Sequence, residues 1–254
     1  MPSTDDILIG LASIANGWRT AAIAWHVALG VWLLAVLVGW RPSARVAGYL
    51  LVSPFVSVMA AAIVTGNAFN GAAFAAFFLV FVLVASRLSR EPVRIGPLRV
   101  VIAGTLLVVF GWGYPHFLET ERWTPYLYAA PLGILPCPTL SAVMGLTLLF
   151  GQLGSRVWSY ALATTALVYG AIGAFVLGVA LDYVLLVGAL LTTVAALNVD
   201  FSVDRTSEGG PSCSKLGPFR GALSIVDGEQ WLSWSNRGNR RTRFRDPRRR
   251  RRST

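Results

Sequence analysis

Over residues 1–199, long blocks of apolar residues alternate with short polar connections. A helix that crosses a hydrocarbon core of about 30 Å needs roughly 20 apolar residues, because each residue adds about 1.5 Å. Seven stretches meet or approach that length: Trp18–Trp40, Val46–Thr65, Ala68–Ser86, Val100–Tyr114, Pro136–Gly151, Trp158–Gly178 and Tyr183–Val199. The pattern therefore predicts an all-α protein, a polytopic transmembrane helical bundle of about seven spans.

The two ends of the chain differ from this predicted transmembrane domain at residues 18–199. Residues 1–17 place two acids before an apolar stripe, which predicts a short helix lying in the membrane interface. Residues 200–254 contain no apolar run of membrane length and include Arg237–Arg252, where ten Arg stand with one Asp. Because a run of like charges repels itself, we expect this Arg-rich tail to be disordered.

Composition favours a membrane-embedded protein over a soluble one. Of 254 residues, 55% are hydrophobic and 13% are charged, and the mean hydropathy is +0.60, whereas a soluble domain has about 25% charged residues. The net charge of +10 comes mostly from residues 200–254, where thirteen Lys or Arg accompany six acids. We expect this tail to bind anionic lipid, at ~1 kcal/mol per basic residue near the surface. Nucleic acid is the less favoured partner, because Trp231 and Trp234 suit a membrane interface.

The Arg residues of the short connections give the predicted topology an orientation. Seven of them fall in the connections between spans one and two, three and four, and five and six: Arg41, Arg45, Arg87, Arg90, Arg94, Arg99 and Arg156. The other side holds Arg19 and Arg122. Since cytoplasmic loops carry the excess of basic residues, we expect the N-terminus outside and the C-terminal tail in the cytoplasm.

Two prolines, Pro136 and Pro138, bracket Cys137 where the fifth span begins. Proline lacks an N–H, fixes its own φ and pushes the preceding residue out of the helical region. A helix cannot run straight through this segment, whereas Pro138 suits the first turn of a new helix with Cys137 near its N-cap. The pattern predicts a broken fifth helix, preceded by a half-helix or re-entrant segment at Tyr126–Leu135.

Polar residues that are uncommon in a membrane fall mainly on the outer side of this topology. Lipid cannot satisfy such groups, so they face the interior of a bundle or a cavity. The candidate pocket residues are His26, Asn67, Asn70, Tyr114, His116, Cys137, Thr139, Ser141 and Asp182. Small residues recur at four-residue steps beside them, as in Cys137, Ser141 and Gly145, which lets helix backbones approach closely. We therefore expect small-residue seams that converge on an outward-opening polar pocket.

Three of these candidates also suit ordinary structural roles. His26 can hydrogen-bond a neighbouring carbonyl within the bundle, and Asp182 can cap the N-terminus of the last span. Cys137 can pack as a small buried apolar residue, although a helix N-terminus would favour its thiolate and make it reactive. From the sequence, both roles of each residue stay open.

Three short motifs resemble those of a bacterial family of unknown function. They are Tyr114-Pro115, Pro136-Cys137-Pro138-Thr139 and Asp182 at the opening of the last span. Members of that family are multi-pass inner-membrane proteins that typically show Pro-Cys-Pro-Thr-Thr, and this chain has Leu140 at the second Thr. The likeness extends over about Leu11 to Val199. It implies the fold class and a bacterial inner-membrane location, but brings no established activity.

The function that the sequence favours is a small-solute or ion permease with an outward-facing polar pocket. A broken helix whose N-terminus points into a bundle is a recurrent substrate site, since freed backbone donors and the positive end of the helix dipole face the solute. Proton coupling would depend on His26 and Asp182. One alternative is an accessory subunit that binds a membrane protein or a second copy through its small-residue faces. The other is a membrane metal or redox enzyme that uses Cys137.

Motifs that identify common cofactors are missing from the sequence. The chain has two Cys and two His in total, without Cys-x-x-Cys or paired-His spacing, which excludes a rich metal site. Gly151-Gln152-Leu153-Gly154 lacks the Lys of a phosphate-binding loop. The sequence thus predicts no metal site and identifies no cofactor.

Overall fold

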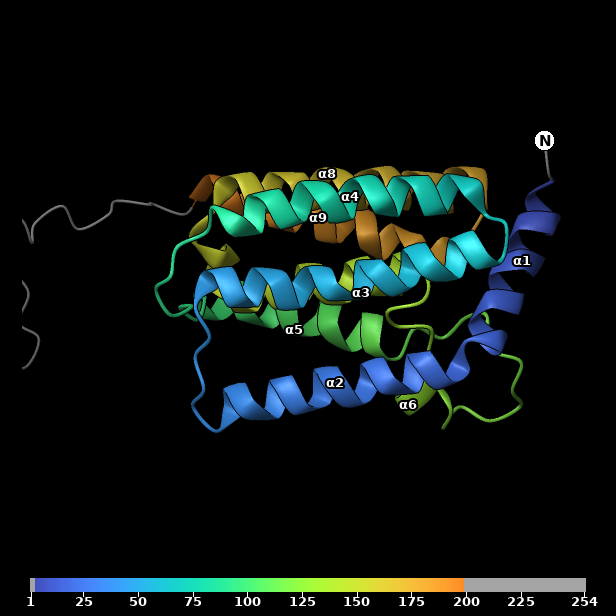
Figure 1. Cartoon of the computed structure of the whole chain (residues 1–254), viewed down its shortest axis with the longest axis horizontal. Coiled ribbons are helices and arrows are strands. Elements are labelled where there is room, and N and C mark those ends of the chain that lie inside the picture. The colour runs from blue at the N-terminus through green and yellow to red at the C-terminus, as the bar shows by residue number, and fades with distance from the viewer. Residues whose placement is uncertain (1–2, 199–254) are drawn as a thin grey trace, which may run out of the picture. The chain divides into compact units, whose positions relative to one another are not determined.

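The computed structural model describes residues 3–198, and the regular secondary structure of that range is helical (Figure 1). Its α-helices are α1 (Thr4–Gly17), α2 (Arg19–Leu37), α3 (Ala44–Val64), α4 (Ala68–Ser86), α5 (Leu98–Trp112), α6 (Tyr126–Ala129), α7 (Pro136–Leu149), α8 (Arg156–Ala171) and α9 (Tyr183–Asn198). Two 3₁₀ segments, η1 (Gly151–Gly154) and η3 (Ala180–Asp182), and a π-helical turn, η2 (Ile172–Val176), join the last three helices. The all-α prediction is confirmed for this range. The predictions about the Arg-rich tail fall outside the described residues.

Within residues 3–198, five helices are long and apolar enough to cross a membrane: α2, α3, α4, α8 continued through η2, and α9 preceded by η3. They have 19 to 21 residues and mean hydropathies between 1.5 and 2.3. The other two predicted spans also form helices, but α5 has 15 residues and α7 has 14. At about 1.5 Å per residue, α7 extends for about 21 Å, which is shorter than a hydrocarbon core of about 30 Å.

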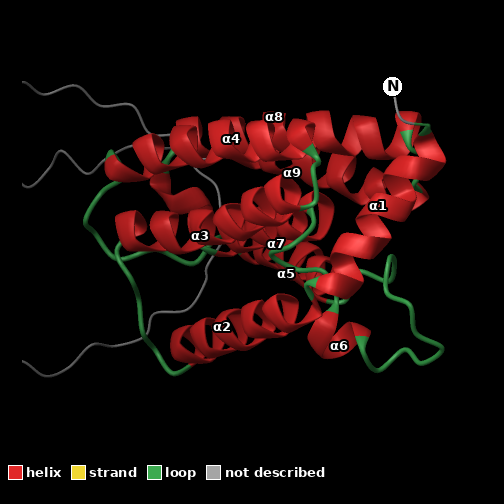
Figure 2. Ribbon diagram, turned by 45° about the vertical axis from the view of Figure 1, so that its right-hand side comes forward, coloured by secondary structure: helices red, strands yellow, loops and turns green. Residues whose placement is uncertain are grey.

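The long helices run side by side, and α1 lies across one end of them (Figure 1; Figure 2). α7 is the most enclosed element, because 12 of its 14 residues are buried. α2 lies along one side of the bundle, next to α6 (Figure 1). α1 packs through Leu11, Ile14 and Ala15, and the first two of these belong to the apolar stripe predicted for an interfacial helix.

Glycines hold α5 and α7 at a very short separation. A Cβ atom on Gly145 would lie 2.5 Å from the carbonyl oxygen of Gly104, and one on Gly111 would lie 2.5 Å from the carbonyl oxygen of Pro138. Neither carbonyl can retreat unless the helix that carries it moves. Small residues therefore set the distance between the two helices, and Gly145 belongs to the four-residue series that the sequence singled out.

The helix that precedes α7 is shorter than the sequence predicted. Only one helical turn, α6, forms within the predicted half-helix at Tyr126–Leu135. The chain then turns through Gly133, which has a φ of +74° and packs so closely on the indole of Trp25 that a Cβ atom would collide with it. A positive φ and a close approach are conditions that glycine alone meets without strain. The break before α7 is therefore a compact turn.

The close approach of α5 and α7 makes a testable prediction at Gly145. We expect Gly145→Val to destabilise the protein by about 1–3 kcal/mol or more, because the added methyl groups overpack the helix interface. Thermal unfolding of the detergent-purified chain measures the effect. Gly17→Ala is the matched control, since no atom lies within 4 Å of its Cβ position. An unchanged melting temperature for Gly145→Val would show that glycine does not set this separation.

Candidate functional site

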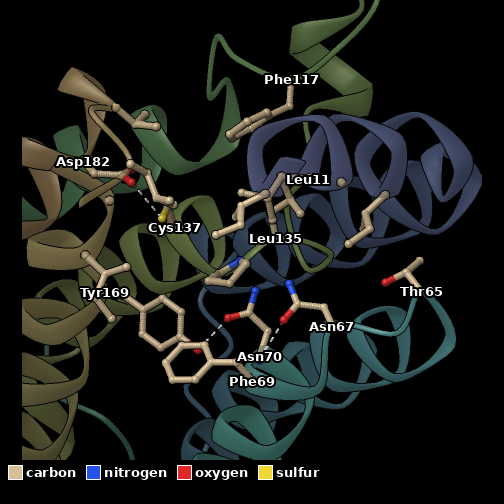
Figure 3. Close-up of a pocket in the computed structure, with 18 of the residues that line it drawn as sticks. Leu11, Thr65, Asn67, Phe69, Asn70, Phe117, Leu135, Cys137, Tyr169 and Asp182 are labelled. Atoms are coloured by element: carbon tan, nitrogen blue, oxygen red, sulfur yellow. Dashed lines mark hydrogen bonds between the residues drawn. The ribbon is translucent and has the colours of Figure 1, made fainter. Parts of the chain in front are cut away.

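A cavity of about 720 Å³ lies at the α1 end of the bundle (Figure 3). Its walls come from α1, the turn between α3 and α4, the start of α7, and the segment that runs from the end of α8 to η3. Four of the nine candidate residues line it, namely Asn67, Asn70, Cys137 and Asp182. Figure 3 shows Cys137 beside Asp182 on one wall and the two asparagines on another.

Three side chains form a hydrogen-bonded cluster at the cavity wall, where Cys137 and Asp182 line the space and the buried Tyr114 does not. The phenol of Tyr114 donates to Oδ1 of Asp182 at 2.9 Å, and the thiol of Cys137 donates to Oδ2 of the same carboxyl group at 3.2 Å. Tyr114 is fully buried and Asp182 is 2% exposed. The cluster joins residues 68 and 45 positions apart in the sequence. It thus ties together the end of α5, the start of α7 and the start of α9.

The irregular chain after α8 places Asp182 in the cavity wall. α8 widens into η2, and the chain then reverses at Gly178, which has a φ of +68°. The N–H of Val179 donates to the carbonyl of Gly173, and the N–H of Asp182 donates to the carbonyl of Val179. Gly173 makes the room for the carboxylate, because a Cβ atom there would overlap Oδ2. π-Helical turns of this kind are frequent at functional sites.

The sequence left open whether Asp182 caps the last span. The hydrogen bonds of its side chain do not go to that helix end. Both carboxyl oxygens accept hydrogen bonds from side chains of other elements. The 3₁₀ turn η3 stands between the preceding loop and α9. Asp182 therefore connects elements of the bundle through its side chain.

Cys137 reaches the cavity because its helix begins just before it. Leu135 is the extended N-cap residue of α7, and Pro136 and Pro138 occupy the first turn on either side of Cys137. The same prolines limit what this helix end can donate. They have no N–H, and the N–H of Thr139 bonds the carbonyl of Leu135 at 3.4 Å, so Cys137 carries the one N–H of this turn that is left over. The expected row of freed backbone donors is therefore reduced to a single group.

Two asparagines and a tyrosine form a second polar wall. Asn67 caps α4, since its side-chain oxygen accepts from the N–H of Asn70 at 3.1 Å. The side-chain oxygen of Asn70 accepts from the phenol of Tyr169 at 3.1 Å. Tyr169 comes from α8, so this pair links the α3–α4 turn to the helix that leads to Asp182 (Figure 3).

α1 covers part of the cavity and is tied to a neighbouring loop. Its capping box joins Ser3 and Asp6 through reciprocal hydrogen bonds. The hydroxyl and then the N–H of Ser3 lower the pKa of the exposed Asp6 carboxyl, which is therefore an anion at neutral pH. Asn16 donates to the carbonyl of Phe117 and accepts from the N–H of Glu119, which fixes the loop that follows Tyr114.

His26 lies outside the cavity and has a structural role. Its ring nitrogens contact the carbonyl oxygens of Ala22 at 2.8 Å and Trp112 at 2.9 Å, and the ring packs edge-on against the indole of Trp112. The carbonyl bond that the sequence left open is thus present. It fastens α2 to the end of α5, two residues before Tyr114.

The four remaining candidates also lie outside the walls of this cavity: Tyr114, which bonds Asp182, and Thr139, Ser141 and His116. The hydroxyl of Thr139 donates to the carbonyl of Leu135 and accepts from the N–H of Gly133, which stabilises the turn before α7. Ser141 is fully buried, and its hydroxyl donates across to α5. His116 is exposed on the loop after Tyr114 and packs on Phe117.

Several residues of the site gave no sequence signal strong enough to single them out. Tyr169 stands within an apolar run, and Phe69 and Phe117 look like ordinary apolar residues there. Gly173 falls between the small residues that recur at four-residue steps in its span, which are Ala166, Gly170, Ala174 and Gly178, and it lies in η2, where the helical register changes. The clue available for Asp6 was its place in the first turn of an amphipathic helix.

The site does not resemble a metal centre. Among residues 3–198, no group of three or more His, Cys, Asp or Glu side chains could hold a metal ion. Cys137 and Asp182 would supply two ligands, and they bond each other. The prediction of no metal site stays a prediction for the chain as a whole.

The buried cluster makes a second prediction. We expect Tyr114→Phe to destabilise the protein by about 1–3 kcal/mol, because Oδ1 of Asp182 loses its donor while it stays buried. Tyr160→Phe is the matched control, since Tyr160 is 37% exposed on α8. Chemical or thermal unfolding of the purified variants measures both. Equal stability of the two variants would contradict a cluster that holds the helix ends together.

Comparisons with known proteins find no relative from which a role of the site could be inferred. No family model, curated protein or solved structure matches the chain. The residues that carry the three motifs, Tyr114, Cys137 and Asp182, nevertheless meet in one hydrogen-bonded cluster.

Proposed function

We propose that this protein is a seven-span permease of the bacterial inner membrane, and that the cavity at its α1 end is the binding site for a small solute. The observation that carries the proposal is the carboxylate of Asp182, 2% exposed and in the wall of a cavity of about 720 Å³. A buried acid in a membrane bundle is expensive to maintain and is typically functional. The likeness of the three motifs to those of multi-pass inner-membrane proteins supports the location.

The short helix α7 accounts for the depth of the cavity. α7 has 14 residues and begins at the cavity wall, where Pro136 to Pro138 line the space. A full-length span here would fill that volume with its first turns. In a seven-span arrangement, α5 and α7 cross the rest of the membrane together, and the cavity occupies the depth that α7 leaves open on the outer side.

The geometry favours binding over covalent catalysis by Cys137. A thiolate that attacks a carbonyl needs donors for the developing oxyanion. The first turn of α7 offers only the N–H of Cys137, because two prolines occupy that turn. The thiol itself donates to Asp182, so it supports the carboxylate.

Charge supports the orientation. Seven of the nine Arg of residues 3–198 lie in the connections or the first helical turns at the end opposite α1, whereas Arg19 and Arg122 lie at the α1 end. The positive-inside rule then puts the cavity on the outer side of the membrane. The exposed N-terminal helix α1 would lie at the outer interface.

Labelling in intact cells tests the orientation. In a chain with both cysteines replaced by serine, we expect a membrane-impermeant maleimide to label Glu121→Cys and not Ser89→Cys, because the two exposed positions lie at opposite ends of the bundle. Permeabilised cells provide the control, in which both positions should react. Labelling of position 89 alone in intact cells would invert the topology.

Solute uptake tests the permease. We expect proteoliposomes to accumulate at least one class among radiolabelled amines, amino acids and sugars above protein-free liposomes. Asp182→Asn should reduce that uptake at least tenfold, since a hydrogen bond to a charged group contributes about 1.5–3 kcal/mol. Thr105→Ala, at an exposed position of α5, is the control. Uptake of none of these classes, or equal uptake by the Asp182 variant, would refute the proposal.

A further inference from the structure

The charged side chains in the cavity wall are all acidic. Asp6 from α1 and Asp182 from the end of η3 line the space, and among the described lining residues there is no Lys, Arg or His. His116, on the loop after Tyr114, is exposed and does not belong to the wall. The wall therefore presents negative charge and neutral polar groups to a ligand.

The end of the bundle around the cavity also has a net negative charge. Five of the six acids of residues 3–198 lie there: Asp5, Asp6, Glu119, Glu121 and Asp182. Two Arg accompany them, Arg19 and Arg122. A cleft with an excess of one sign of charge raises the local concentration of the opposite ion and speeds its encounter. The approach to the cavity is thus favourable for cations and unfavourable for anions.

Asp182 has bonding capacity left for a ligand. An ionised carboxylate offers about four acceptor positions, and the two donors recorded for this one are the phenol of Tyr114 and the thiol of Cys137. Both partners are neutral, so they orient and solvate the carboxylate without balancing its charge. A positively charged donor in the cavity would supply that balance, because a buried charge is stabilised by an opposite charge in contact.

The rest of the wall suits an apolar ligand body. The aromatic rings of Phe69, Phe117 and Tyr169 face the space together with aliphatic residues of α1 and η2 (Figure 3). Aromatic faces attract cations as well as apolar groups. Such an apolar wall does not suit a hydrated metal ion, and the cluster presents only one thiol and one carboxylate to the cavity.

We propose that the cavity binds an amphipathic organic cation, with a protonated amine donating to Asp182 and an apolar body packed among Phe69, Phe117 and Tyr169. This inference rests on the proposed function, since it names the class of solute that the permease site would take. Tyr114 and Cys137 act as positioning residues that hold the carboxylate toward the space.

Three probes of the same shape and different charge test the inference. 2-Phenylethylamine is a cation at neutral pH, 2-phenylethanol is neutral and 3-phenylpropanoate is an anion. We expect the amine alone to raise the melting temperature of the detergent-purified full-length protein, and calorimetry to show at least tenfold weaker binding of the alcohol and the carboxylate. Asp182→Asn should weaken binding of the amine at least tenfold. Asp5→Asn is the matched control, because Asp5 is at the same end but outside the cavity wall.

Each other outcome overturns the inference, and the outcomes separate it from the permease proposal. Equal or tighter binding of the alcohol or the carboxylate to the wild-type protein would refute the cationic class while leaving a solute site in place. Binding of Zn²⁺ that is lost in Cys137→Ser would replace the organic cation with a metal ion. If none of the probes binds, the cationic class is wrong, and uptake in proteoliposomes decides the permease proposal by itself. The wild-type series needs no variant, so it stands even if Asp182→Asn does not fold.

Discussion

The constraint on which the rest of the structure depends is the burial of one carboxyl group, that of Asp182, inside an apolar bundle. Asp182 is 2% exposed, and the two hydrogen bonds to its carboxyl group come from Tyr114 and Cys137. Leaving such a group without partners would cost several kcal/mol, so the three helix ends that carry these residues must stay together. Bonds between buried polar groups also strengthen in surroundings of low polarity. One acid thereby fixes the end of the bundle where the cavity lies.

Residues without side-chain bulk or without an N–H make that arrangement possible. Gly111 and Gly145 let α5 and α7 approach until their backbones touch, which brings the end of one helix to the start of the other. Gly173 leaves space for the carboxylate, and α7 begins at Pro136, so that Cys137 lies in its first turn and reaches the carboxylate. These positions contribute little contact of their own, yet they determine where the three bonding side chains lie.

The sequence was sufficient for the helices and insufficient for their irregular joints. Run length alone located every long helix, because apolar blocks of about 20 residues have few alternatives in a membrane. It could not show that α8 widens into η2, since that change of register leaves no mark on composition. It also could not decide between two roles for His26, whose carbonyl partners depend on how α2 packs against α5. For Cys137 and Asp182 the type of residue and its place at a helix end were informative, but their mutual contact required the fold.

The distribution of charge links orientation to ligand class. Arg residues collected at one end of the helices favour keeping that end in the cytoplasm, and the opposite end is left with most of the acids of the described chain. In the proposed orientation that acidic end faces outward and contains the cavity, so the bias that orients the bundle also makes the cavity entrance negative. An anion would meet repulsion there, and the two prolines leave the first turn of α7 with few N–H donors to offer it. A cation would meet attraction, aromatic walls and a carboxylate already held in place by neutral donors, which is the combination that the binding of an amine requires.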